Sequence, residues 1–224
     1  MHLEPHEHHL QVGRTARYAA LGQPGPQTAE VWIVCHGFGQ LARNFIRDFV
    51  PIAAPSRYIV APEALSRFYL GEVTGATSAT ARIGAAWMTR EDRVSEIADY
   101  VAYLDALYAR VFETVERARV TVTALGFSQG VAAASRWAAV GTATLDRLIL
   151  WAGRLPDEFA APEHVAALRR MRCVMVAGAE DPMLTGGTQR VERARLERLG
   201  LDVQWVSFDG GHVVDRKTLL QIAT

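Results

Sequence analysis

The chain has little cysteine, a single lysine and no excess of charge of either sign. Its 224 residues carry 24 Lys and Arg against 24 Asp and Glu, so the formal net charge is zero. A balanced charge gives no reason to expect nucleic acid or an anionic membrane surface as a partner. Lys217 is the only lysine, and this preference for arginine says little about function.

Long hydrophobic runs are also missing. The two cysteines, Cys35 and Cys173, each lie inside a short apolar run, which predicts buried free thiols rather than a disulfide. No window reaches the ~20 apolar residues of a membrane span. The first residues, 1–5, lack the basic and apolar stretches of a secretory signal. These absences predict a cytoplasmic protein without a membrane span.

The chain contains no internal repeat, low-complexity tract or shift in composition that would separate two domains. Half of it is hydrophobic (50%) and 21% is charged, which is an ordinary globular balance. A chain of this length can bury one sizeable core. We therefore expect residues 1–224 to form a single domain.

Short apolar runs alternate along the chain with longer segments of helical periodicity. The predicted strands are 31–35, 58–61, 120–125, 148–151, 173–177 and 203–208. The predicted helices are 42–50, 90–115, 129–140, 162–170, 188–199 and 213–222. This alternation is typical of a doubly wound, mainly parallel sheet. The run 9–21, followed by the turn-rich segment 22–26, predicts an antiparallel edge strand at the N-terminus.

A nucleophile motif follows the third of these strands. Gly126-Phe127-Ser128-Gln129-Gly130 has the G-x-S-x-G pattern, between the apolar run 120–125 and the Ala-rich helix. This strand–turn–helix setting is what a nucleophile elbow requires, because glycines let the chains pass close to a strained turn. The alternative is a Gly-rich turn with a solvent-facing serine. The context favours Ser128 as a nucleophile.

A serine hydroxyl needs a base, and the base needs an orienting acid. His212 follows the last strand on a Gly-rich loop, so it is the expected base. Asp181 and Glu180 both follow the strand 173–177; we prefer Asp181, because Pro182 rigidifies the turn after it, and keep Glu180 as the fallback. The order Ser128, Asp181, His212 then matches that of a known hydrolase triad.

An oxyanion hole is expected after the first parallel strand. His36-Gly37-Phe38-Gly39 follows it directly, and glycines there let backbone N–H groups face a ligand. We expect the N–H groups of Phe38 and Gln129 to hold the oxyanion. An ordinary strand-to-helix turn is the alternative.

Four segments together resemble the carboxylesterase and phospholipase branch of the α/β-hydrolases, which includes the acyl-protein thioesterases. They are His36-Gly37-Phe38-Gly39, Gly126-Phe127-Ser128-Gln129-Gly130, Gly178-Ala179-Glu180-Asp181 and Gly210-Gly211-His212. The resemblance implies an α/β-hydrolase fold and a serine esterase that acts without metal or cofactor. It also implies that Trp87 lines an acyl pocket. Two departures lie near the substrate: Gln40 stands where an acid is common, and Met88-Thr89 replaces Phe-Asp after Trp87.

The expected substrate is a small ester with a short acyl group. We place Trp87, Met88, Met183 and Leu184, with Phe38, around that group. Residues 152–172 leave room for a connecting helix but for no lid domain, so the site should be open. The segment 69–86, rich in small residues, is expected to be a loop at the mouth of the site or a plain connection.

Three function classes remain to be compared. The first is a carboxylic ester hydrolase, the second a thioesterase or acyltransferase with the same acyl-enzyme, and the third a non-catalytic binding protein on this fold. A complete triad argues against the third. His2, His6, His8 and His9 lack the further ligands of a metal site, so no metal is expected. The oligomeric state is open, with a homodimer as one option.

Overall fold

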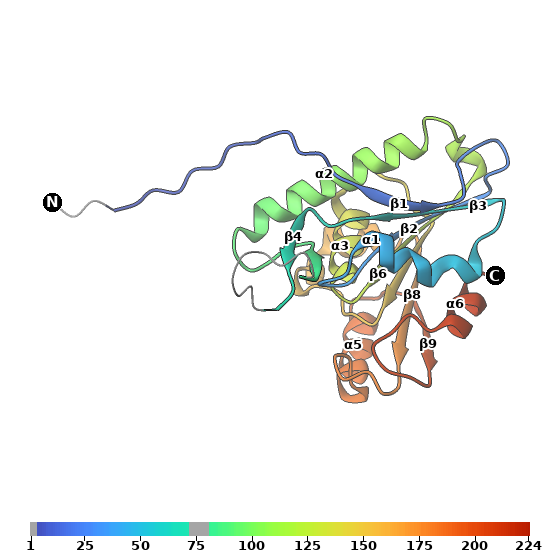
Figure 1. Cartoon of the computed structure of the whole chain (residues 1–224). Coiled ribbons are helices and arrows are strands. Elements are labelled where there is room, and N and C mark those ends of the chain that lie inside the picture. The colour runs from blue at the N-terminus through green and yellow to red at the C-terminus, as the bar shows by residue number, and fades with distance from the viewer. Residues whose placement is uncertain (1–3, 72–80) are drawn as a thin grey trace.

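A seven-stranded sheet forms the centre of the molecule (Figure 1). The computed structural model describes residues 4–71 and 81–224. The strands are β1 (Tyr18–Leu21), β2 (Glu30–Cys35), β3 (Arg57–Pro62), β6 (Thr121–Phe127), β7 (Arg147–Trp151), β8 (Arg172–Gly178) and β9 (Val203–Phe208). Their order is β1-β3-β2-β6-β7-β8-β9, and every pairing is parallel except that of β1 with β3. The predicted doubly wound sheet with an antiparallel edge strand is confirmed.

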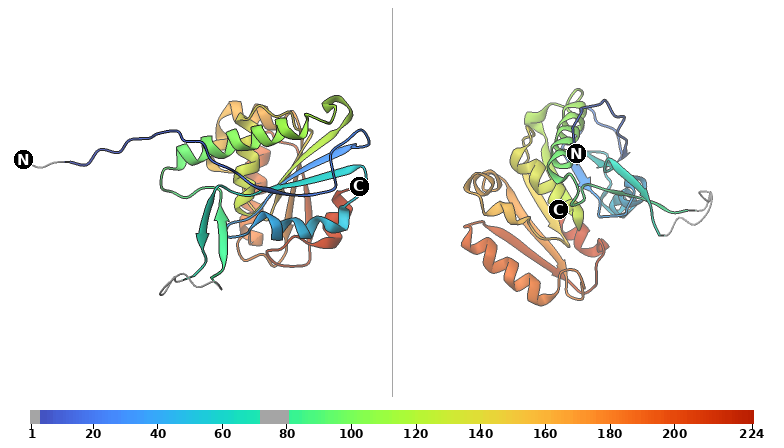
Figure 2. Two further views of the ribbon diagram at one scale, coloured as in Figure 1. Left: turned by 45° about the horizontal axis from the view of Figure 1, so that its top comes forward. Right: turned by 90° about the vertical axis from the view of Figure 1, so that its left-hand side faces the viewer.

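Helices cover both faces of this sheet (Figures 1 and 2). They are α1 (Ala42–Phe45), α2 (Arg93–Val111), α3 (Gln129–Val140), α4 (Pro162–Leu168), α5 (Gly186–Arg198) and α6 (Arg216–Ile222), with 3₁₀ turns η1 (Ile46–Ile52), η2 (Arg117–Arg119) and η3 (Asp157–Ala160). The predicted helix over 42–50 is instead one α-helical turn followed by η1. Pro51 lies inside η1, and its ring and missing N–H oppose an α-helix there.

The N-terminal edge strand is shorter than predicted. Of the run 9–21 only Tyr18–Leu21 pairs, and it pairs with β3 rather than with β2, which follows it in sequence. Upstream, Leu10 and Val12 are 85% and 76% exposed. Because those side chains find no apolar surface to cover, pairing ends at Tyr18.

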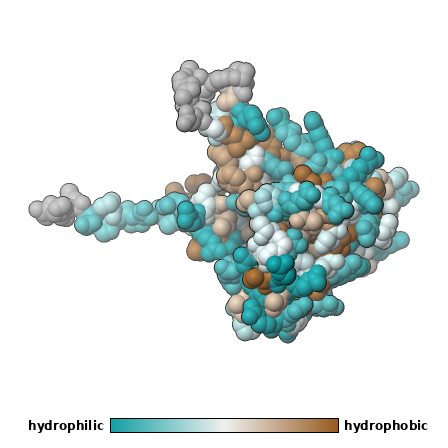
Figure 3. All heavy atoms as spheres, turned by 90° about the horizontal axis from the view of Figure 1, so that it is seen from below, coloured by the Kyte–Doolittle hydropathy of each residue, from teal (hydrophilic) through white to brown (hydrophobic). Residues whose placement is uncertain are grey.

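A two-stranded hairpin stands outside the main sheet. The predicted loop 69–86 is wrong at both ends, because β4 (Ser66–Tyr69) pairs antiparallel with β5 (Ile83–Ala86); residues 72–80 lie outside the described part of the chain. The hairpin projects from the body of the molecule (Figure 2). Tyr69 and Ile83 are half-exposed on it, and hydrophobic residues gather on this side of the surface (Figure 3).

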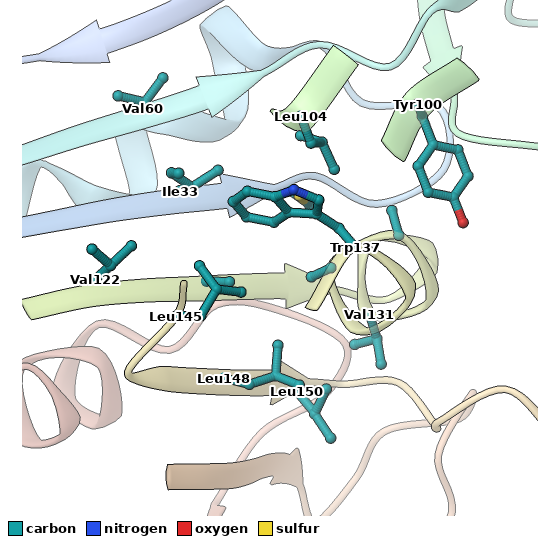
Figure 4. Close-up of a cluster of buried hydrophobic side chains, with 14 of the residues drawn as sticks. Ile33, Val60, Tyr100, Leu104, Val122, Val131, Trp137, Leu145, Leu148 and Leu150 are labelled. Atoms are coloured by element: carbon teal, nitrogen blue, oxygen red, sulfur yellow. The ribbon is translucent and has the colours of Figure 1, made fainter. Parts of the chain in front are cut away.

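The core lies on both faces of the sheet. On one face, side chains of α2 and α3 pack against the strands, and Figure 4 shows Trp137 of α3 reaching toward Ile33 and Leu104. On the other, α1, η1 and α6 cover a second cluster that includes Trp32 and Trp151. Cys35 and Cys173 are buried free thiols, as predicted.

The chain crosses from β7 to β8 without a lid domain. Residues 152–171 contain only η3 and α4, in agreement with the predicted lack of an inserted lid. Among the residues that the structure describes, none of the helices combines the length and the apolar character needed to cross a lipid bilayer.

Candidate active site

Ser128 occupies a strained turn between β6 and α3. Its backbone angles are φ 53° and ψ −118°, outside the regions that side chains with a Cβ ordinarily adopt. Such a conformation costs of order 1–3 kcal/mol and persists only where the surroundings enforce it. Here a Cβ on Gly126 would lie 2.2 Å from the Gly130 carbonyl oxygen, and one on Gly130 would lie 2.1 Å from that of Cys35. The two glycines of the motif therefore allow the close approach that positions the serine.

The turn after β2 lies beside this serine. A Cβ on Gly37 would come within 3.2 Å of the Cβ of Ser128. The N–H of Gly37 donates to Gln40 Oε1 (2.8 Å), that of Gly39 to Ala85 O (2.9 Å) and that of Gln40 to Gly37 O (3.2 Å). Within the described residues, the N–H of Phe38 finds no acceptor. It is thus available to an external oxyanion.

Gln129 begins α3 directly after Ser128. Because it is the first residue of the helix, no backbone carbonyl of the helix can accept a hydrogen bond from its N–H. Its side chain bridges to a neighbouring segment: the N–H of Trp87 donates to Gln129 Oε1 (3.0 Å), and Gln129 Nε2 donates to Met88 O (2.8 Å). This clamp was not foreseen from the sequence. It fixes the residues after β5 against the start of the helix.

The hairpin holds the turn from the other side. The N–H of Ala85 donates to Gln40 O (3.2 Å), and Ala85 O accepts from Gly39. Gly84 lies so close that a Cβ there would meet the Gly39 carbonyl oxygen at 2.6 Å. The Phe38 ring, 58% exposed, packs on Phe68 with ring centroids 5.1 Å apart. The backbone of the turn is therefore braced on the hairpin.

His212 and Asp181 meet at the same edge of the sheet. His212 Nδ1 is 2.8 Å from Asp181 Oδ2, and Asp181 Oδ1 accepts from the N–H groups of Met183 (2.8 Å) and Leu184 (3.2 Å). The carboxylate is fully buried, whereas the imidazole is 25% exposed. The imidazole also packs on Phe127, with centroids 4.9 Å apart, and Phe127 directly precedes Ser128. The three predicted triad residues thus share one corner of the molecule.

Two other acids that flank this site in the sequence, Glu180 and Asp215, have different surroundings in the structure. Glu180 is exposed, and its N–H donates to Gly210 O. Asp215 caps α6, where its Oδ2 accepts from the N–H of Thr218 (2.8 Å) and from the Thr218 hydroxyl (2.7 Å). These hydrogen bonds lower the pKa of Asp215.

The residues predicted to surround an acyl group are not alike in exposure. Trp87 and Leu184 are each 2% exposed, and Met88 is partly buried with its sulfur 3.0 Å from Arg136 Nη1. Met183, by contrast, is 73% exposed. Phe38 and Met183 therefore expose apolar surface, whereas Trp87 and Leu184 are buried in the interior.

His36 is a residue to which the sequence analysis gave no role of its own. Its Nδ1–H donates to Gly37 O (2.8 Å), and its Nε2 accepts from the N–H of Ala64 (3.0 Å). The indole N–H of Trp87 donates to His36 O (2.8 Å). Burial lowers the pKa of His36, and only the neutral imidazole has one donor and one acceptor. His36 is thus a neutral imidazole that holds the turn after β2 in place through hydrogen bonds. The sequence signal that could have indicated this role is its position directly after that strand.

Metal ligands are not gathered in the described part of the chain. No group of three or more His, Cys, Asp or Glu side chains within residues 4–71 and 81–224 is arranged to hold a metal ion. His9 contacts Asp92 (3.1 Å) at the surface, and His2 lies outside the described residues.

Comparison with known proteins gives a likeness in fold. No protein-family model matches this chain, and no curated protein matches it in sequence. Among solved structures, Zea mays acyl-protein thioesterase 2 is 16% identical at a TM-score of 0.69, over 93% of this chain and 96% of that one. Esterase PE8 is 21% identical at a TM-score of 0.66, over 94% of this chain and 97% of that one. A carboxylesterase from Mesorhizobium loti is 19% identical at a TM-score of 0.67, over 93% of this chain and 92% of that one.

These identities are low, so the likeness defines a class of fold. The sheet order, the single antiparallel edge strand and the flanking helices match the α/β-hydrolase fold, and the predicted fold is confirmed.

Proposed function

We propose that this protein is a serine ester hydrolase in which Ser128 is the nucleophile, His212 the base and Asp181 the orienting acid. The observation that carries the proposal is the Asp181–His212 contact of 2.8 Å beside the strained turn at Ser128. A buried carboxylate on Nδ1 leaves Nε2 of the imidazole as the proton acceptor. The esterases and thioesterases that share this fold support the same reading.

The reaction would begin with attack of Ser128 Oγ on the acyl carbonyl carbon. His212 Nε2 takes the hydroxyl proton as the new C–O bond forms, and Asp181 stabilises the resulting imidazolium. The carbonyl electrons move to oxygen, where the N–H groups of Phe38 and Gln129 receive the negative charge. His212 then returns its proton to the departing alkoxide, and the alcohol leaves.

Water completes the cycle from the acyl-enzyme. His212 takes a proton from water as its oxygen attacks the acyl carbon, and the same two N–H groups hold the second oxyanion. The acid is released when the bond to Ser128 Oγ breaks and His212 protonates that oxygen. A thioester would pass through the same acyl-enzyme, so a panel of matched oxygen and sulfur esters separates esterase from thioesterase activity.

Covalent labelling tests the nucleophile. A fluorophosphonate probe should label the wild-type protein at Ser128, and Ser128→Ala should lose both labelling and ester turnover. In the best-studied serine hydrolase, removal of the nucleophile costs roughly 10⁶ in kcat. Ser207→Ala, at an exposed serine of β9, is the matched control and should keep both. Retention of a tenth of wild-type turnover by Ser128→Ala would show that the assignment is wrong.

We also propose a preference for short acyl groups. Trp87 and Leu184 are nearly fully buried, so apolar contact for an acyl chain comes from Phe38, Met88 and Met183. No inserted lid extends this surface between β7 and β8. Each further methylene without apolar contact forgoes ~0.8 kcal/mol of burial. Acyl groups of about two to six carbons should therefore be preferred.

A p-nitrophenyl ester series of increasing acyl length measures this preference. We expect kcat/KM to level off or fall beyond about six carbons, and to be unchanged on adding micelles. A kcat/KM that climbs to twelve carbons, or that rises sharply with micelles, would contradict the short pocket while leaving the Ser128 assignment intact.

A further inference from the structure

A buried carboxylate lies beside the turn after β2, in the link between β3 and β4. The side chain of Glu63 is 1% exposed, and the proposed reaction gives it no direct part. Its Oε1 accepts from Arg17 Nε (2.5 Å) and Arg67 Nη1 (3.0 Å), and its Oε2 accepts from the N–H of Ala42 (3.2 Å). One carboxylate therefore joins the segment before β1, the hairpin strand β4 and the start of α1.

The two arginine contacts do not explain why this carboxylate is buried. The side chains of Arg17 and Arg67 are 51% and 38% exposed. Ion pairs with such exposed partners are screened by water and contribute little to stability, whereas burial of a charge is costly. The third contact differs, because Ala42 is itself 2% exposed. Within residues 4–71 and 81–224, its N–H has no acceptor other than Glu63.

The start of α1 has no capping group of its own. The first turn of a helix leaves backbone N–H groups without partners inside the helix. Leu41, at the N-cap position, has an apolar side chain and makes no capping hydrogen bond. Glu63 supplies the missing acceptor for Ala42 from 21 positions away in the sequence. The carboxylate thus fixes the point where the turn after β2 becomes helix.

Consecutive residues of the link after β3 hold both ends of the turn that carries Phe38. At its beginning, the N–H of Ala64 donates to His36 Nε2 (3.0 Å); at its end, Glu63 Oε2 accepts from the N–H of Ala42 (3.2 Å). We propose that Glu63 is a positioning residue for this turn, which acts through Ala42 to fix the direction of the Phe38 N–H. The inference rests on the proposed function, because it concerns the same oxyanion donor.

Glu63→Gln tests this role, because both oxygens of the carboxylate accept hydrogen bonds and an amide has only one acceptor oxygen. The positive charge of the two guanidinium groups attracts that oxygen, so the NH₂ group faces the N–H of Ala42 and the contact is lost. Complete loss of an oxyanion donor costs about 10²–10³ in kcat, so displacement of the Phe38 N–H should cost at least about tenfold. KM should change by less than about threefold, because the oxyanion exists only after attack.

Glu30→Gln is the matched control for loss of a carboxylate that binds arginine. Glu30 accepts from Arg57 Nε (3.0 Å) and Nη2 (2.8 Å), and from the indole N–H of Trp32 (3.1 Å). It is the first residue of β2, whereas the turn follows the last residue of that strand. Glu30→Gln should therefore lower stability without changing kcat.

Ala42→Pro removes the donor from the other side of the contact. Proline is tolerated at the first position of a helix, and Leu41 already has the extended backbone (φ −111°, ψ 140°) that a residue before proline prefers. This variant should lower kcat as Glu63→Gln does. If both act through one hydrogen bond, the double variant should lose no more kcat than either single variant. Losses that multiply in the double variant would overturn the proposal.

The wild type and the variants are compared by kcat and KM on a short-chain ester, by fluorophosphonate labelling and by hydrogen exchange of the Gly39 amide. We expect complete labelling throughout, with low kcat and faster Gly39 exchange only where the contact between Glu63 and Ala42 is broken. Wild-type kcat in Glu63→Gln, or an equal loss in Glu30→Gln, would overturn the positioning role, while labelling of Ser128 would still uphold the proposed function.

A wild-type protein that neither hydrolyses esters nor reacts with the probe would contradict the proposed function instead. Exchange of the Gly39 amide then decides the positioning role without any turnover. Faster exchange in Glu63→Gln than in Glu30→Gln would support it, and equal exchange in the two variants would overturn it.

Discussion

Asp181 and Glu180 are neighbours in sequence, but the turn after β8 sends their side chains into different surroundings. Asp181 is buried, with one oxygen on His212 Nδ1 and the other held by two backbone N–H groups. Glu180 is exposed to solvent. A carboxylate can fix the tautomer of an imidazole only if it is itself held in place. This difference makes Asp181 the acid on which the proposed mechanism depends.

Replacement of each acid by its amide isolates that role. Asp181→Asn favours the wrong imidazole tautomer, so kcat should fall by about 10⁴. Glu180→Gln, the matched control, should change kcat by less than about threefold, because its side chain is solvated. The measurement is kcat on a p-nitrophenyl ester for both variants. Equal losses, or a larger loss at Glu180, would reverse the choice between the two acids.

Gln40 shows how a departure from a family pattern is absorbed locally. An acid is common at this position in the carboxylesterase and phospholipase branch that the chain resembles. Here the amide oxygen of Gln40 accepts from the N–H of Gly37 (2.8 Å). A carboxylate or an amide oxygen can play that part equally well. The substitution therefore leaves the turn closed and the N–H of Phe38 free to face a ligand.

At the scale of elements, the nucleophile unit was readable from the sequence and the hairpin was not. The strand 120–125, the motif around Ser128 and the helix 129–140 combine strong local signals, and the structure has α3 at Gln129–Val140, as predicted. The hairpin strands are four residues each, and β5 reads Ile-Gly-Ala-Ala. That composition has little intrinsic strand preference, so its pairing depends on contacts with the turn at Gly39, which sequence periodicity does not report.

The same limit applies to the site. Ser128, Asp181 and His212 each follow a recognisable strand, and chain order suggested that they converge. The clamp by the Gln129 side chain and the brace by His36 join residues 42 and 28 positions apart. Such contacts arise from packing between elements, and no local pattern in this sequence encodes them.

The docking of the hairpin on the turn leads to a prediction for Gly84. In Gly84→Ala the new methyl group would lie 2.6 Å from the Gly39 carbonyl oxygen, so the turn or the hairpin must move. Displacement of the Phe38 N–H weakens the oxyanion contact, and loss of one such donor costs about 10²–10³ in kcat. We expect a fall of at least tenfold in kcat with a smaller change in KM.

Gly25→Ala is the control, since a Cβ there meets nothing within 4 Å. It should leave kcat unchanged. Kinetics on a short-chain ester, with circular dichroism to check folding, compares the two variants. A Gly84→Ala protein with wild-type kcat would show that the hairpin does not set the geometry of the turn.

At the scale of the whole molecule, buried titratable groups should make stability depend on pH in two separate ranges. Burial would raise the pKa of Glu63, but hydrogen bonds from Arg17 and Arg67 outweigh it and lower that pKa. The pKa of Glu158 is also lowered despite its burial, because its carboxylate accepts hydrogen bonds from its own backbone N–H and from Arg136. The stabilisation from these carboxylates is present above their unfolded pKa of ~4.3 and is lost only as the pH falls below it.

His36 affects the free energy of unfolding at a higher pH than these carboxylates do. Burial lowers its pKa in the folded state, and protonation of Nε2 would remove the acceptor for the N–H of Ala64 (3.0 Å). Below ~6.5, the pKa of His36 in the unfolded chain, the unfolded chain therefore binds a proton at His36 that the folded chain does not bind. The free energy of unfolding should fall by up to about 1.4 kcal/mol for each pH unit between that value and the lower folded pKa. Above pH ~7 this contribution should be flat.

Urea unfolding between pH 8 and pH 5 measures the effect. His36→Gln keeps one donor and one acceptor without a titrating group, so its free energy of unfolding should vary less with pH over this range than that of the wild type. His164→Gln, at a partly exposed histidine of α4, is the control and should keep the wild-type slope. Because the carboxylates titrate below pH 5, they contribute little to the comparison. Parallel curves for His36→Gln and the wild type would show that burial of His36 does not govern stability in this range.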